Sequence, residues 1–174
     1  YLGTAVERSL YALLARGGVI GGTSAGAAVM SRVMIASGKE KATMGTGFDL
    51  LPGSVIDQHF IARKRRQRLV GVLAARPGLV GLGIDEGTAL IVRGRSLQVV
   101  GDSVVSVFLA PEGKGGPGFR PLKETRLRQG ETADFTALRR AAAARAAGRY
   151  PPVAEVTPEV PSGALVLGGG GGMP

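Results

Sequence analysis

The residues Gly22-Thr23-Ser24-Ala25-Gly26 form a G-x-S-x-G pattern between a short apolar run and an Ala-rich run. A strand, a sharp turn and a helix in that order are typical of a nucleophile elbow, in which the strained turn exposes the serine Oγ. We expect both flanking glycines to be required, because a Cβ would collide where the chain doubles back. A Gly-rich turn with a helix-capping serine would contain the same residue types. The pattern therefore predicts nucleophilic chemistry at Ser24, with simple capping as the alternative.

Two more polar side chains come directly after expected strands, as Ser24 does. His59, the single histidine of the chain, follows the expected strand 54–58, and Glu86 closely follows the expected strand 79–84. The carboxyl ends of parallel strands meet at one edge of a sheet, where such proteins carry out their chemistry. A hydroxyl, an imidazole and a carboxylate together are what serine-dependent acyl transfer requires.

The identity of the acid is open on the residues alone. Asp85 and Asp57 are rivals of Glu86, and neighbouring residues of a strand point to opposite faces, so Asp85 and Glu86 cannot both easily face His59. A partly buried histidine and a turn carboxylate would also explain His59 and Glu86 without any catalysis.

A run of basic residues follows His59, at Arg63, Lys64, Arg65, Arg66 and Arg68. On a helix Arg63 would lie one turn from His59, where its guanidinium could bind a substrate carboxylate. A solvated basic face, a localisation signal or a nucleic-acid patch would produce the same run.

The composition limits the classes of site. The chain has 174 residues, 44% hydrophobic and 20% charged, which suits a globular domain with a real core. Cysteine is absent and histidine occurs once, which excludes disulfides, thiolate metal sites and a multi-histidine metal site within this chain. We expect no metal and no cofactor, and no apolar run is long enough to span a membrane.

The formal net charge of +9 would suit a nucleic-acid partner. Aromatic residues are only 5% of the chain, which argues against base-stacking platforms. An excess of arginine with much alanine and glycine also follows from a GC-rich coding bias, so we expect neither a nucleic-acid nor a membrane partner.

Periodicity predicts alternating helices and strands, with a run of strands after residue 84. Helices are expected at 2–16, 25–35, 61–76 and 136–149, strands at 19–20, 54–58, 79–84, 88–92, 97–100, 104–109 and 164–167, and a loop at 37–53. Because helices separate the first three strands, we expect a mostly parallel sheet with helices on both faces, a three-layer α/β/α arrangement.

Three separated stretches resemble the cyanophycinases and related aspartyl-directed serine peptidases. They are Gly21–Met30; Leu51-Pro52-Gly53 with Ile56–Phe60, Arg63, Arg65 and Arg68-Leu69; and Gly81–Ala89. The resemblance implies a sandwich related to class I glutamine amidotransferases, with Ser24 as nucleophile, His59 as base and Glu86 as the third member. It also implies that Asp57, Gln58, Arg63, Arg65 and Arg68 shape the substrate pocket. For an acyl transfer at Ser24 we add the Ala25 N–H as an oxyanion donor.

The resemblance implies a peptide substrate rich in aspartyl and arginyl groups, with cyanophycin cut to β-Asp-Arg dipeptides as the leading case. A homodimer is left open, and an amidotransferase-like or binding domain that keeps the elbow is the alternative function.

Family members carry about another half-sheet before the nucleophile, and the corresponding segment is absent here. We therefore expect a piece of a tandem protein: residues 1–149 from the back of one peptidase domain, a Pro-rich linker at 150–162, and residues 163–174 resembling the first strand of a second copy. Without the half-sheet and its oxyanion donor, we expect this piece by itself to be a poor catalyst or inactive.

Overall fold

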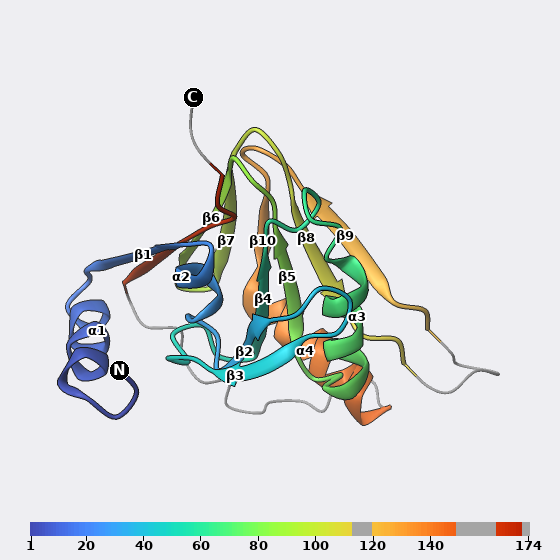
Figure 1. The fold of residues 1–174 in the computed structure, drawn as a ribbon, viewed down its shortest axis with the longest axis horizontal. Helices are drawn as coiled ribbons and strands as arrows, with labels where there is room; N and C mark the ends of the chain where they lie inside the picture. The colour runs from blue at the N-terminus through green and yellow to red at the C-terminus, as the bar shows by residue number, and fades with distance from the viewer. Residues whose placement is uncertain (113–119, 149–162, 172–174) are drawn as a thin grey trace.

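A computed structural model describes residues 1–112, 120–148 and 163–171 as a mixed α/β structure (Figure 1). The helices are α1 (Ala5–Ala15), α2 (Ala25–Ala28), α3 (Arg66–Ala75) and α4 (Phe135–Ala147). The strands are β1 (Val19–Thr23), β2 (Val33–Ser37), β3 (Thr43–Thr46), β4 (Ser54–Gln58), β5 (Val80–Ile84), β6 (Thr88–Arg93), β7 (Ser96–Gly101), β8 (Val105–Leu109), β9 (Lys123–Leu127), β10 (Thr132–Asp134) and β11 (Ala164–Gly168).

The strands form a five-stranded sheet in the order β1-β11-β6-β7-β10, a four-stranded sheet β4-β5-β8-β9 and a β2-β3 pair. Only the pairs β1–β11 and β4–β5 run parallel, and the other pairs among the described strands run antiparallel. The prediction of a mostly parallel sheet is therefore wrong. From β5 onward, short turns rather than helices connect β6, β7 and β8 in sequence, and short connections favour antiparallel neighbours.

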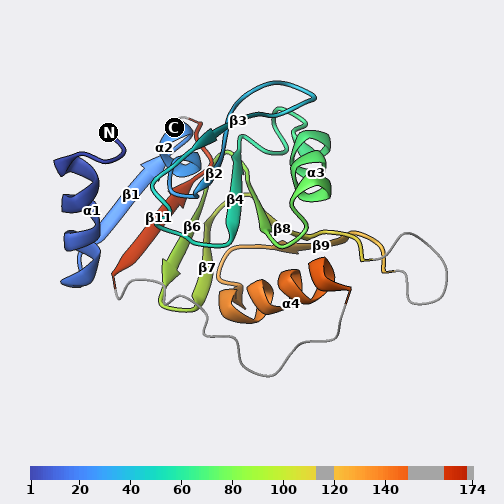
Figure 2. The same ribbon diagram turned by 90° about the horizontal axis from the view of Figure 1, so that it is seen from below.

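Helices cover both faces of the four-stranded sheet. Figure 2 shows α3 and α4 on opposite sides of β8 and β9, so this part of the structure consists of a sheet between two helices. A three-layer sandwich for the chain as a whole stays a prediction. Buried Leu, Ile and Val side chains from both larger sheets form the main core cluster, together with Phe135 from α4.

Two of the expected helical segments are shorter in the structure. The run expected to be helical at 25–35 leaves the helix after Ala28, and the carbonyls of Val29 and Met30 accept hydrogen bonds from Phe48 and Leu51 instead. The expected loop 37–53 holds β3, which pairs with β2 as a hairpin. The helix expected from residue 61 begins at Arg66, after a series of turns.

The C-terminal strand β11 lies between β1 and β6, parallel to the first and antiparallel to the second. Residues 149–162, which contain the expected linker 150–162, lie outside the described residues. The division into a peptidase domain, a linker and a second copy stays a prediction. In the described part of the chain, no helix has the length and apolar character needed to cross a membrane.

Candidate active site

Ser24 lies at the turn between β1 and α2 with φ 53° and ψ −119°. A positive φ is uncommon for a residue with a side chain and marks local strain that the surrounding structure must maintain. A Cβ on Gly22 would collide with the carbonyl of Gly26, whereas a Cβ on Gly26 would meet nothing within 4 Å. The expected steric requirement therefore holds on the strand side of Ser24 and is wrong for Gly26. Ser24 has no side-chain capping bond, so the capping alternative has no support.

His59 and Glu86 meet Ser24 in a continuous hydrogen-bonded series. The Ser24 Oγ lies 2.9 Å from His59 Nε2, and His59 Nδ1 lies 2.6 Å from Glu86 Oε1. His59 is 7% exposed, also has a positive φ of 51°, and directly follows β4. The Glu86 side chain is 41% exposed, so water reaches the carboxylate end of the series. A hydroxyl bonded to an imidazole, which is itself oriented by a carboxylate, is the arrangement that activates a serine as a nucleophile.

Asp85 has a different role from its neighbour Glu86. Its Oδ1 accepts hydrogen bonds of 3.0 Å from the N–H groups of both Ile61 and Ala62, and its Oδ2 accepts one of 2.8 Å from the Ser103 hydroxyl. Burial alone would raise the pKa of the Asp85 carboxyl, but these hydrogen bonds outweigh burial and lower it below its ordinary value. Asp85 therefore fixes the turns that follow His59, while Glu86 contacts the imidazole.

Gln58 connects the basic run to the serine. Its Oε1 accepts a 2.8 Å hydrogen bond from Arg65 Nη1 and lies 3.5 Å from the Ser24 Oγ. Arg65 Nη1 also donates to the Gln58 carbonyl at 2.7 Å. Burial and the nearby Arg68 lower the pKa of the Arg65 guanidinium, and Asp57 partly opposes this effect. Arg65 thus holds the Gln58 amide beside Ser24.

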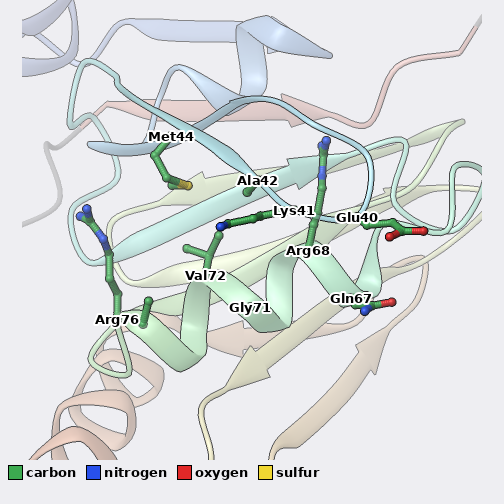
Figure 3. Close-up of a pocket in the computed structure, with 10 residues that line it drawn as sticks. Glu40, Lys41, Ala42, Met44, Gln67, Arg68, Gly71, Val72 and Arg76 are labelled. Atoms are coloured by element: carbon green, nitrogen blue, oxygen red, sulfur yellow. The ribbon is translucent and has the colours of Figure 1, made fainter.

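Asp57 and Arg68 form a buried ion pair with each other. Arg68 Nε donates to Asp57 Oδ2 at 2.7 Å, and these residues are 3% and 0% exposed, respectively. Arg68 also donates to the carbonyl of Gly38 and lines a pocket of about 380 Å³ between α3 and the β2–β3 hairpin (Figure 3). The residues that line this pocket do not include Ser24, His59 or Glu86. Burial of the pair favours a supporting role for both residues behind β4.

Arg63 and Ala25 are exposed beside the series. The Arg63 N–H donates to the His59 carbonyl at 3.0 Å, and within the described ranges its guanidinium has no side-chain partner. Ala25 begins α2 directly after Ser24, and the first amides of a helix lack partners inside the helix. Among the described residues, Ala25 thus provides a backbone N–H directly after Ser24, and Arg63 is an exposed cation four residues after His59.

The glycines at 168–171 also contact this site, whereas the sequence pattern favoured residues 163–174 as the start of a second copy. A Cβ on Gly170 would lie 2.5 Å from His59 Cε1, and a Cβ on Gly171 would lie 2.9 Å from Glu86 Cβ. The unbroken run Gly168–Gly172 was the available signal, since repeated glycine often marks close backbone approach.

The fold and the site define a class of α/β proteins in which a strained serine after a strand faces an imidazole held by a carboxylate. The sequence model of peptidase family S51 matches residues 3–100, which is more than half of the chain and includes Ser24, His59 and Glu86. The chain belongs to peptidase family S51.

Curated relatives are cyanophycinases. The chain is 45% identical to the cyanophycinase of Trichormus variabilis over 102 residues, which cover 53% of this chain and 34% of that protein. It is 40% identical to the cyanophycinase of Synechococcus elongatus over 97 residues, covering 51% and 30%, respectively. The chain thus spans about a third of the length of these relatives. A crystal structure of a peptidase from an acI-B1 Actinobacterium aligns with a TM-score of 0.39 and 28% identity, over 64% of this chain and 43% of that one.

Proposed function

We propose that this chain carries the catalytic side chains of a serine-type exopeptidase that hydrolyses aspartyl peptide bonds. The observation that carries the proposal is the series from the Ser24 Oγ through the His59 imidazole to Glu86 Oε1, with separations of 2.9 Å and 2.6 Å. Membership of peptidase family S51 supports the reaction class.

In the proposed reaction, His59 Nε2 takes the proton of the Ser24 hydroxyl as Oγ attacks the carbonyl that follows an aspartyl residue. The proton on His59 Nδ1 stays bonded to Glu86, which stabilises the imidazolium. The Ala25 N–H donates to the oxyanion of the tetrahedral intermediate, and His59 then protonates the leaving amine. Water, deprotonated by the same imidazole, releases the acyl group and regenerates Ser24.

The substrate that we propose is cyanophycin, a polyaspartate with arginine on its side chains, cut to β-Asp-Arg dipeptides. The curated relatives of this chain are named for that polymer. Arg63 is exposed, and its backbone N–H bonds to the His59 carbonyl. Its guanidinium is suited to a substrate carboxylate, because arginine binds carboxylates through paired hydrogen bonds. We propose Gln58, held by Arg65, as a second contact close to the scissile bond.

The test compares the wild-type chain with Ser24→Ala for release of β-Asp-Arg from cyanophycin, measured by chromatography. The proposal predicts release by the wild type and none by the variant, with both proteins equally folded by circular dichroism. Equal release by both would disprove the role of Ser24. A folded wild type without hydrolysis would favour an amidotransferase-like or binding domain that retains the elbow.

A further inference from the structure

The glycine segment Gly168–Gly171 connects the backbones of the three residues at the site. The carbonyls of Gly168, Gly169 and Gly170 accept hydrogen bonds from three separate amides. The donors are Ser24 N–H at 3.2 Å, His59 N–H at 2.9 Å and Gly87 N–H at 3.3 Å, the last directly after Glu86. Three consecutive carbonyls thus fix the three segments that carry the hydroxyl, the imidazole and the carboxylate.

The strand before these glycines makes the corresponding connection in the sheet. β1 ends one residue before Ser24 and β6 begins two residues after Glu86, and β11 pairs with both. Within the described residues, β11 is the strand that pairs with β1, and Leu165 and Leu167 of β11 are buried in the core. The position of Ser24 relative to Glu86 therefore depends on the packing of β11 between β1 and β6. Figure 1 shows β11 as the red strand beside β1.

The backbone of the segment approaches the two side chains so closely that an added Cβ would force them to shift. Gly170 has φ +88°, and a Cβ there would lie 2.5 Å from His59 Cε1 and 2.7 Å from Nε2, the nitrogen that faces Ser24. At Gly171 a Cβ would meet the partly exposed Glu86 side chain at 2.9 Å. The glycines therefore limit the positions that the imidazole and the carboxylate can take.

We propose that Gly168–Gly171 is a positioning segment of the active site. In this proposal, the pairing of β11 with β1 and β6 sets the distance between Ser24 Oγ and His59 Nε2. The proposal rests on the proposed function of Ser24 and His59. Ser24 and His59 both have positive φ, and such strained conformations persist only when surrounding contacts over-determine them. The bonds to Gly168 and Gly169 supply those contacts at the strained residues themselves.

The test uses the full chain with Gly170→Ala, and Gly94→Ala as the matched control. Gly94 lies in the β6–β7 turn with φ +55° and has nothing within 4 Å of its would-be Cβ, so the control introduces backbone strain away from the site. Two readouts are measured: the rate at which a fluorophosphonate labels the serine, and the low-field proton signal of the single histidine bonded to Glu86. We expect Gly170→Ala to lose that signal and to slow labelling on the order of 100-fold, as a misplacement of about 1 Å typically does. Gly94→Ala should keep both close to wild type.

Labelling and a proton signal in Gly170→Ala that match those of Gly94→Ala would overturn the proposal. If Gly170→Ala does not fold, Gly171→Ala provides the test, because the three atoms nearest to its Cβ belong to the partly exposed Glu86 side chain rather than to the backbone. Gly171→Ala should then lose the low-field signal while remaining folded, and retention of that signal would equally overturn the proposal. A wild type that is labelled but does not hydrolyse cyanophycin, with labelling lost in Gly170→Ala, would reject the proposed substrate and support the positioning segment.

Discussion

The positions of Ser24, His59 and Glu86 depend on neighbouring residues outside the proposed catalytic series. Gln58 lies beside Ser24 because Arg65 donates a hydrogen bond to its side-chain amide oxygen. The turns after His59 keep their shape because Asp85 Oδ1 accepts hydrogen bonds from the N–H groups of Ile61 and Ala62. Adjacent residues Asp85 and Glu86 therefore support the site in two ways, one through the backbone and one through the imidazole.

Replacement of Glu86 by glutamine should leave the fold intact and reduce hydrolysis. The amide keeps the shape of the side chain but removes the charge that stabilises the imidazolium. By analogy with the loss of a triad acid, the decrease in kcat should be on the order of 10³- to 10⁴-fold. Steady-state kinetics measure the effect, and Asp102→Asn, which changes an exposed carboxylate in the turn between β7 and β8, serves as the control. A decrease below tenfold would exclude Glu86 as the acid.

Replacement of Asp85 by asparagine should destabilise the protein and reduce the pH dependence of its stability. The variant loses charge-assisted hydrogen bonds, which are typically worth about 1–3 kcal/mol each. The pKa of Asp85 is lowered in the folded state, so its stabilisation is present above the unfolded value of about 3.9 and is lost as the pH falls through the lower folded value. Urea unfolding from pH 6 down to pH 2 should show a flatter curve for Asp85→Asn. Parallel curves for the two proteins would contradict this assignment.

At the scale of the elements, the buried pair of Asp57 on β4 and Arg68 on α3 joins a strand to the helix that covers it. Arg68→Met alone leaves the buried Asp57 carboxylate with only the longer contact to Arg65 Nη1, at 3.6 Å, and should reduce the free energy of unfolding by about 3 kcal/mol. The double variant Asp57→Leu/Arg68→Met removes both charges and should be more stable than the single variant. Chemical denaturation of the three proteins gives the comparison, and a double variant less stable than Arg68→Met would refute the account.

The sequence predicted elements where local pattern and tertiary structure agree. The expected strand at 54–58 matches the bounds of β4, and the candidates for nucleophile, base and acid lie side by side. The expected reason holds for His59 and Glu86, which follow the parallel neighbours β4 and β5, but not for Ser24, because β1 belongs to the other sheet. The choice between Asp85 and Glu86 needed the resemblance, since the residues alone left it open.

Other elements were not predictable because distant contacts decide them. Residues 25–35 have apolar and alanine residues that suit a helix, yet carbonyls after Ala28 bond to the 47–51 segment and the chain continues as β2. The position of β11 beside β1 joins residues more than 140 positions apart, and no local pattern carries that register. The predicted parallel sheet failed for the same reason, because β1 pairs with β11 rather than with β4.

At the scale of the whole molecule, the net charge is +9, but the basic residues at 63–68 do not form one continuous basic face. Arg65 and Arg68 turn inward to Gln58 and Asp57, and Arg66 bonds to Glu124 at 2.8 Å. We therefore expect no tight DNA binding in a gel-shift assay at about 150 mM salt, where screening weakens exposed charges. A strong complex with a steep salt dependence would instead indicate a nucleic-acid interface.

The most direct test of the central claim is mass spectrometry of the chain after exposure to a fluorophosphonate. The account predicts one adduct, located on Ser24, with labelling lost in His59→Ala because the imidazole no longer removes the hydroxyl proton. Labelling of another serine, or labelling of Ser24 at an equal rate in His59→Ala, would contradict it.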